Sequence, residues 1–324
     1  MDPSPLGLVC KGGRFVEDLE FVSMEKSLEL EDSYALVTGK QRIHKNTYNS
    51  CVLNFKNQDQ DQEQMALIFR AYNEGIAFQY LFPGEPERTA TVVEEHTAFN
   101  FPEGNFWGHP YDTLSTYTPA YETYYQGVKV GTSAPWNKNG WAFPILVESQ
   151  STWMLVSEAG FDGSYGASHL HPECENGTYR IKFAEAGEAE SYYENSSTAH
   201  LPLRTPWRFI AIGASLGDIV ETSLPTDLSA PSQIYDTSWI RPGRATWSWW
   251  SDNDSPQDYD RLVPFVDFAA DLGWEYFLVD ANWNRMKNGT MEELAAYAAS
   301  REVGLFLWYN SGGKHLSLIH ISEP

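Results

Sequence analysis

Residues 64–82 read QMALIFRAYNEGIAFQYLF, and this stretch decides the fold class of the first two thirds of the chain. Residues 64–71 alternate and then become continuously apolar, and residues 76–82 are again largely apolar. Between them, residues 72–75 (YNEG) supply turn residues and a glycine that tolerates a positive φ. Two such runs joined by a short turn predict a β-hairpin.

Five similar short runs follow within residues 1–237, separated by Gly, Pro, Asn and Asp. They cover residues 89–94, 142–148, 153–157, 179–183 and 208–212. Many short strands without an intervening helical pattern predict an all-β sandwich.

The pattern changes near residue 236, so we expect a second domain to begin at residue 238. Residues 245–250 (ATWSWW), 276–279 (YFLV) and 304–309 (GLFLWY) predict three buried strands. Two helices are expected between them. The first begins at SPQD (residues 255–258) and ends before Gly273, and the second begins at Thr290, where Glu293 completes a capping box. Alternating buried strands and helices predict a parallel sheet.

An open doubly wound sheet and a closed (β/α)8 barrel both begin in this way. The first strand is not followed by a glycine-rich phosphate loop, which weakens a nucleotide-binding interpretation. Polar and aromatic residues follow the strands instead, namely Asp252, Asp280 with Trp283, and Asn310. In a barrel, this rim holds the active site.

The charge and composition narrow the classes of partner. The 324 residues include 22 Lys+Arg and 44 Asp+Glu, for a formal net charge of −22. This charge argues against binding to nucleic acid or to an anionic membrane surface, and no apolar run reaches the roughly 18 residues of a transmembrane helix. The charge suits a neutral substrate, such as a sugar, or a cation, and sugar sites use the flat faces of aromatic residues, of which the chain has 12 Trp, 18 Tyr and 17 Phe. His169 and His171 could form a metal pair, but we expect them in a surface loop.

A collinear series of motifs resembles glycoside hydrolase family 97. The series comprises residues 70–78 (RAYNEGIAF), 157–159 (SEA), 204–208 (RTPWR), 237–243 (TSWIRPG), 248–250 (SWW), 265–276 (FVDFAADLGWEY), 278–280 (LVD) and 307–313 (LWYNSGG). The resemblance extends over nearly the whole chain up to His315.

The resemblance implies an architecture and an activity. The family's enzymes are bacterial, typically periplasmic, exo-acting α-glucosidases and α-galactosidases. Their architecture is an N-terminal β-super-sandwich, a (β/α)8 barrel and a small C-terminal β domain. We therefore expect a super-sandwich over residues 1–237 and the first three strands of a barrel over residues 238–315. A periplasmic or secreted location and an oligosaccharide or glycoside substrate follow from the resemblance, whereas the oligomeric state does not.

The resemblance also assigns roles to residues. The family binds a calcium ion in its active site, and Glu158 matches the position of a carboxylate ligand from the sandwich domain. The catalytic carboxyl groups lie on later barrel strands, so we expect them beyond residue 315 and expect this chain to be inactive. Candidate sugar-binding residues are Trp249, Trp250, Asp280, Trp283 and Asn310. Trp249 and Trp250 are adjacent in the expected strand, so one should face the barrel interior and the other the helices.

Two alternatives remain open for these residues. Asp280 could bind sugar hydroxyls or cap its loop, and Trp283 could stack on a sugar or cover the rim. The whole chain could instead be a non-catalytic carbohydrate-binding β-sandwich protein. At the chain's ends, residues 316–324 (LSLIHISEP) are expected to be a translated sequencing adapter, and the N-terminus is expected to be truncated.

Overall fold

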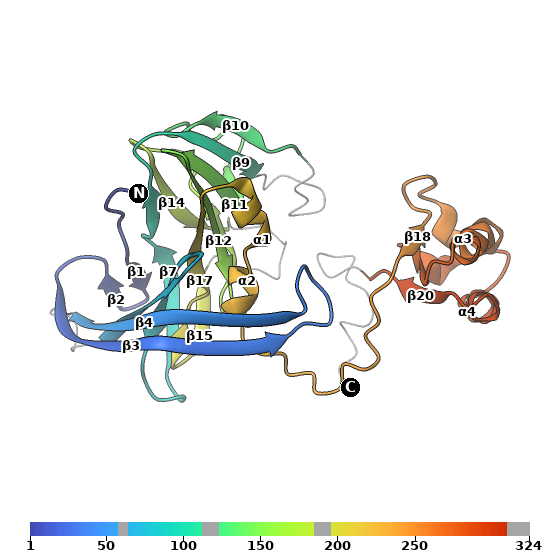
Figure 1. Ribbon diagram of the computed structural model, residues 1–324, viewed down its shortest axis with the longest axis horizontal. Helices are drawn as coiled ribbons and strands as arrows, with labels where there is room; N and C mark the ends of the chain where they lie inside the picture. The colour runs from blue at the N-terminus through green and yellow to red at the C-terminus, as the bar shows by residue number, and fades with distance from the viewer. Residues whose placement is uncertain (58–63, 112–122, 185–195, 310–324) are drawn as a thin grey trace. The chain divides into compact units, whose positions relative to one another are not determined.

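The computed structural model describes residues 1–57, 64–111, 123–184 and 196–309 (Figure 1). The chain divides into two units, Met1–Gln233 and Ile234–Pro324. The predicted boundary at residue 238 and the assignment of residues 316–324 to an adapter stay predictions, and the latter residues lie outside the described ranges.

The first unit consists mostly of β-strands. Its strands are β1 (Leu8–Cys10), β2 (Gly13–Phe15), β3 (Leu19–Ala35), β4 (Ile43–Asn57), β5 (Gln64–Tyr72), β6 (Gly75–Phe82), β7 (Thr89–Glu95), β8 (Ala98–Asn100), β9 (Asn105–Tyr111), β10 (Gln126–Lys129), β11 (Gly140–Ser149), β12 (Thr152–Ala159), β13 (Ser168–Leu170), β14 (Thr178–Phe183), β15 (Ser197–His200), β16 (Leu203–Arg204) and β17 (Trp207–Gly213). Two short helices follow, α1 (Leu216–Glu221) and α2 (Leu224–Asp227).

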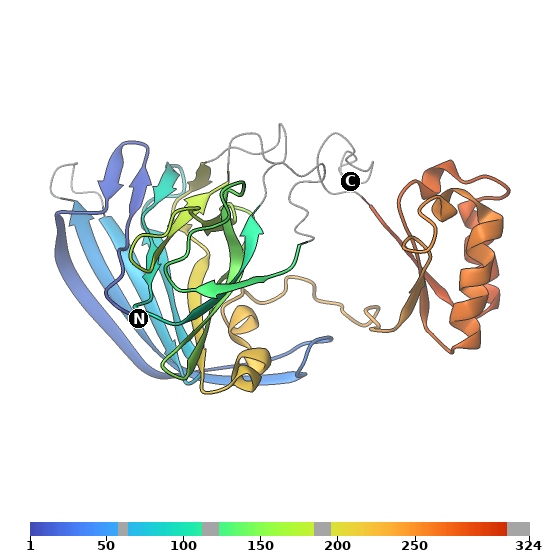
Figure 2. The same ribbon diagram turned by 90° about the horizontal axis from the view of Figure 1, so that it is seen from above.

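These strands form two sheets in the part of the chain that the structure describes. The small sheet has the order β15-β7-β1-β2, and the main path of the large sheet is β3-β4-β5-β6-β17-β12-β11-β13-β14-β8. Figure 2 shows the large sheet as a strongly curved layer whose blue strands wrap around one side of the unit. The mostly β fold expected for this region is confirmed.

The hairpin predicted over residues 64–82 is confirmed. Strands β5 and β6 pair antiparallel with Tyr72 opposite Gly75, so only Asn73 and Glu74 form the loop. A Cβ atom on Gly75 would lie 2.1 Å from the carbonyl oxygen of Ile210, on the neighbouring strand β17. Glycine is therefore required because β17 packs directly against the turn.

The longest strands, β3 and β4, were not among the predicted runs. They have 17 and 15 residues and form an antiparallel pair. Most β3 side chains are exposed, including Phe21 and Leu28. A strand with so little burial has a weak apolar pattern in its sequence. Its strand conformation depends instead on cross-strand hydrogen bonds to β4.

The core of the first unit is formed by apolar side chains of both the large and the small sheet. Phe15 and Val92 of the small sheet and Tyr80, Trp141 and Tyr179 of the large sheet belong to one buried apolar cluster. The buried residues of α1 and α2, namely Ile219 and Leu224, belong to a second cluster with residues of β17. Side chains that face this interior are thus shielded from water.

The second unit alternates strands and helices as predicted. Its elements are β18 (Ala245–Trp247), the 3₁₀-helix η2 (Ser255–Gln257), α3 (Tyr259–Asp271), β19 (Tyr276–Val279), η3 (Trp283–Arg285), α4 (Met291–Ser300) and β20 (Gly304–Leu307). The order β18-β19-β20 is parallel throughout, so the predicted parallel sheet is confirmed. Thr290 and Glu293 form the predicted capping box at α4. The (β/α)8 barrel stays a prediction.

Two details of the second unit differ from expectation. Strand β18 ends at Trp247, so Trp249 and Trp250 lie in the following turn and not on opposite faces of a strand. The turn is stabilised by backbone hydrogen bonds from Ser251 and Asp252 to the carbonyl of Ser248. Similarly, β20 ends at Leu307. In both places, aromatic residues continue the apolar pattern of the sequence beyond the last residue that pairs with the neighbouring strand.

Candidate functional site

Glu158 lies one residue before the end of β12 and directly opposite Arg208 of β17. Residues opposite each other in an antiparallel pair have adjacent side chains. Here the Nη1 atom of Arg208 donates to Oε1 of Glu158 and forms an ion pair. The strand register therefore places the expected calcium-binding carboxylate against a guanidinium group.

The other side of Arg208 is bound by Glu95, the last residue of β7 in the small sheet. Nε of Arg208 donates to Oε1 of Glu95 at 3.0 Å, and Nη2 donates to Oε2 at 2.6 Å. The side chains of both residues have no exposed surface. This bidentate contact holds the guanidinium plane in one orientation. The resulting Glu95–Arg208–Glu158 cluster joins the two sheets.

Two further residues complete the surroundings of this cluster. The backbone N–H of Ser168 donates to Oε2 of Glu158 at 3.1 Å, and its hydroxyl donates to Oε1. Tyr165 donates to Oε2 of Glu95 at 3.2 Å, and its ring centroid lies 5.9 Å from the guanidinium carbon of Arg208. The cluster is thus hydrogen-bonded on each side, as buried ionic groups require.

Burial dominates the electrostatics of the cluster. Desolvation raises the pKa of Glu158, and the Arg208 charge and the Ser168 hydrogen bonds oppose this shift. Burial lowers the pKa of Arg208, but Glu95 and Glu158 raise it by more, so its net shift is upward. Desolvation also raises the pKa of Tyr165 well above its usual value. With both carboxylates ionised, the cluster has a net charge of −1.

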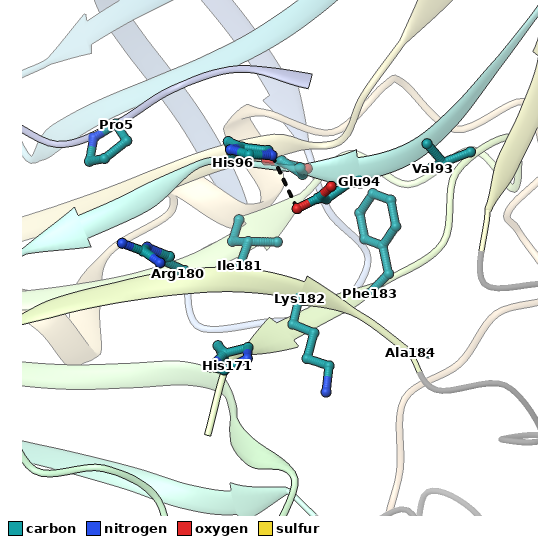
Figure 3. Close-up of a pocket in the computed structure, with 11 residues that line it drawn as sticks. Pro5, Val93, Glu94, His96, His171, Arg180, Ile181, Lys182, Phe183 and Ala184 are labelled. Carbon is teal, nitrogen blue, oxygen red and sulfur yellow. Dashed lines mark ion pairs between the residues drawn. The ribbon is translucent and has the colours of Figure 1, made fainter. Parts of the chain in front are cut away.

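A cavity of about 600 Å³ lies beside this cluster (Figure 3). Figure 3 shows His96 and Glu94 on one side of it, joined by an ion pair of 3.1 Å, and Arg180 and Lys182 on the other. Phe183 also lines the cavity and pairs in register with Ser168. Glu95 also lines part of this cavity, but its carboxylate is buried in the Glu95–Arg208–Glu158 cluster and has no exposed surface.

In the second unit, Asp280 follows β19 and is 6% exposed. Its Oδ2 accepts a hydrogen bond of 2.7 Å from Nε1 of Trp247, and its Oδ1 accepts one of 2.6 Å from the backbone of Ala281. Both carboxylate oxygens of Asp280 are thus bound by groups of the protein itself. The Trp250 ring, 84% exposed, lies 5.0 Å from the Trp247 ring. Trp247, Trp250 and Asp280 therefore form one aromatic corner.

The remaining candidates lie elsewhere in this unit. Trp283 begins η3, donates from Nε1 to the carbonyl of Trp308 at 3.0 Å, and contacts Tyr309 edge-on at 5.5 Å. Trp249 is partly buried, and its carbonyl accepts from Asn253. Asn310 lies outside the described residues. Trp283, a residue of η3, thus contacts the residues that follow β20.

The family comparison decides the identity of the chain. The model described as "Glycosyl-hydrolase 97 N-terminal" matches residues 1–231. The chain belongs to glycoside hydrolase family 97.

Curated relatives of this family 97 chain carry glycosidase names. It is 28% identical over 322 residues to a probable retaining alpha-galactosidase of Streptomyces bingchenggensis, covering 95% of this chain and 47% of the relative. It is also 28% identical over 348 residues to a retaining alpha-galactosidase of Bacteroides thetaiotaomicron, covering 95% and 50%. The chain therefore spans about half the length of these relatives.

Solved structures agree with the family 97 fold. A crystal structure of a beta-arabinopyranosidase matches with a TM-score of 0.87 and 31% identity over 98% of this chain and 51% of that one. A family 97 enzyme of Pseudoalteromonas sp. strain K8, in complex with acarbose, matches with a TM-score of 0.77 and 17% identity over 94% and 48%.

The sequence patterns did not identify Glu95, Arg208, Ser168 or Trp247 as site residues. One signal was available: Arg208 interrupts the apolar run WRFIAI (residues 207–212), and a charge within a buried strand needs a buried partner. Its identity as Glu95 could not be read from the sequence, because the two residues are 113 positions apart. His169 is buried in β13 and stacks on Tyr111 at 3.7 Å, so its expected place in a surface loop was wrong.

Proposed function

We propose that this chain is the N-terminal part of an exo-acting α-glycoside hydrolase that releases a terminal α-galactosyl or α-glucosyl unit. The observation that carries the proposal is the family 97 match over residues 1–231. The names of two curated relatives favour the galactosyl unit and a retaining mechanism. We place the enzyme in the bacterial periplasm or outside the cell, and residues 238–315 at the start of its (β/α)8 barrel.

The reacting carboxyl groups belong, in this proposal, to barrel strands beyond residue 315. Retention needs a general acid and a nucleophile about 5–5.5 Å apart. Among the described residues, Glu158 and Glu95 do not suit this pair, because Arg208 lies between them and holds both. We therefore assign Glu158 to cation binding and not to bond cleavage.

Glu158 fits one position of a calcium site. Each carboxylate oxygen can accept two hydrogen bonds or ligands. Oε1 accepts from Arg208 and Ser168, whereas among the described residues Oε2 accepts only from the Ser168 backbone, which leaves one lone pair of Oε2 without a donor from this part of the chain. Calcium needs six to eight oxygen ligands, and in the described ranges no group of three or more His, Cys, Asp and Glu could hold a metal. The other ligands must come from elsewhere.

When bound, calcium would polarise the substrate and stabilise developing negative charge. The contribution of this chain is to present Oε2 of Glu158 in a fixed direction. In the second unit, the exposed Trp250 ring supplies a flat apolar face for a sugar. Asp280 holds the neighbouring Trp247 ring in place through a hydrogen bond. Trp249, Trp283 and Asn310 are secondary candidates for sugar contacts.

The test is to recover the complete gene and assay its product on aryl α-galactoside, α-glucoside and β-L-arabinopyranoside, with calcium and with a chelator. We expect α-galactoside hydrolysis that requires calcium and gives a product of retained configuration. A full-length product that binds oligosaccharide but hydrolyses none of the three would refute the proposal and favour a non-catalytic carbohydrate-binding protein.

A further inference from the structure

We propose that Arg208, held by Glu95, is a positioning residue that selects which oxygen of Glu158 faces the cation. This inference rests on the proposed function, because it assumes that Glu158 binds calcium. It adds two residues, from two different sheets, to the apparatus that shapes the site.

The first step is the rigidity of Arg208. Three of its nitrogen atoms donate along two edges of the guanidinium group: Nε and Nη2 to the two oxygens of Glu95, and Nη1 to Glu158. Neither the Arg208 nor the Glu95 side chain has exposed surface. A planar guanidinium bound along two edges cannot rotate without breaking buried ionic hydrogen bonds. Arg208 therefore presents Nη1 at a fixed point.

The second step is the asymmetry imposed on Glu158. Arg208 and the Ser168 hydroxyl both bind Oε1, which fills its two acceptor positions, whereas Oε2 has one donor from the residues that the structure describes. The Glu158 side chain is 6% exposed, so the carboxylate is nearly enclosed. Without Arg208, each oxygen would keep one donor from Ser168, and the two oxygens would be equally open to a ligand. Arg208 therefore determines that Oε2 is the oxygen left for a ligand.

A purely structural ion cluster is the competing explanation. Buried ion pairs often contribute little net stability, and well-packed apolar replacements can be neutral. Both explanations predict that damage to the cluster lowers the melting temperature. Only the positioning role predicts a loss of calcium affinity in variants that still fold, because groups that orient metal ligands change affinity about 10- to 100-fold.

The experiment measures calcium binding to the full-length enzyme by calorimetry, and the melting temperature in a chelator, for wild type and four variants. Arg208→Lys keeps the charge but loses the planar fork, and Glu95→Gln keeps the shape but weakens the clamp. Glu158→Gln tests the calcium assignment itself. Arg42→Lys is the matched control, since Arg42 is an exposed arginine of the same unit that does not line the cavity.

We expect Arg208→Lys and Glu95→Gln to raise the calcium Kd about 10- to 100-fold while Arg42→Lys leaves it unchanged. If Glu158→Gln abolishes binding but both cluster variants retain the wild-type Kd, the positioning role is overturned and the calcium assignment stands. If Glu158→Gln itself binds calcium normally, the calcium assignment fails and the positioning role falls with it. Should Arg208→Lys not fold, the Kd of Glu95→Gln decides.

Discussion

His169 should make the first unit less stable as the pH falls from 7 to 5. This residue is 1% exposed, and its ring stacks in parallel on that of Tyr111. Burial lowers the pKa of His169 to about 3, and the nearby charges of Lys182 and His171 add to the shift, whereas a backbone hydrogen bond with Asn139 opposes it. The unfolded chain, with a histidine pKa near 6.5, therefore takes up a proton before the folded chain does.

The sign and size of the effect follow from linkage. Stability is fully present above pH 6.5 and is lost as the pH falls, because the unfolded state binds more protons. Each pH unit below 6.5 costs up to about 1.4 kcal/mol, so the step from pH 7 to pH 5 removes about 2 kcal/mol. At pH 5 this figure depends almost entirely on the unfolded pKa, since the folded pKa lies well below the pH of the measurement.

The assay is urea unfolding of wild type, His169→Phe and His200→Gln at pH 7 and pH 5. Phenylalanine keeps an aromatic ring against Tyr111 but cannot be protonated, and His200 is an exposed histidine of the same unit that serves as the control. We expect His169→Phe to lose about 2 kcal/mol less than wild type over this pH step. An equal loss in wild type and His169→Phe would show that His169 is not the buried neutral group argued for here.

Three further predictions concern the fold and activity of the chain. Gly75→Ala should lower the free energy of unfolding by more than about 1 kcal/mol, because its Cβ would collide with the carbonyl of Ile210. Gly217→Ala, at an exposed position of α1, is the control, and equal urea midpoints for the two variants would contradict the predicted collision. Thr290→Ala removes the N-cap of α4 and should cost about 1 kcal/mol in unfolding of the second unit; an unchanged transition would count against the capping box. The 324-residue chain itself should not hydrolyse aryl α-galactosides or α-glucosides, and turnover above a buffer blank would disprove that.

Local signals in the sequence predicted local structure well. The hairpin at residues 64–82 and the capping box at Thr290 depend on residues within a few positions of each other, and both are confirmed. The parallel order of β18, β19 and β20 followed from the alternation of strand and helix patterns. The aromatic residues at positions 249 and 250 resemble a strand pattern because tryptophan is enriched in strands, but β18 ends at Trp247 and these two residues form a turn.

The candidate site depends on long-range pairing, which the sequence pattern does not encode. Glu158 was identified by resemblance, but its partner Arg208 is 50 residues away, and Glu95 is 113 residues from Arg208. Similarly, the weakly buried β3 and β4 are defined by pairing with each other. Apolar periodicity reports which face of a strand is buried, but not which strand covers it.

The Glu95–Arg208–Glu158 cluster ties the geometry of a ligand to the packing of two sheets. Glu95 belongs to the small sheet, whereas Arg208 and Glu158 are cross-strand partners in the large one. Ionic contacts of 2.6–3.0 Å between Arg208 and Glu95 persist only if the spacing of the sheets is held. That spacing is set by the apolar core, which transmits strain because it is close-packed. If Glu158 binds calcium as proposed, we expect substitutions of core residues such as Val92, in the same strand as Glu95, to change the direction of Oε2 of Glu158 as well as the stability of the core.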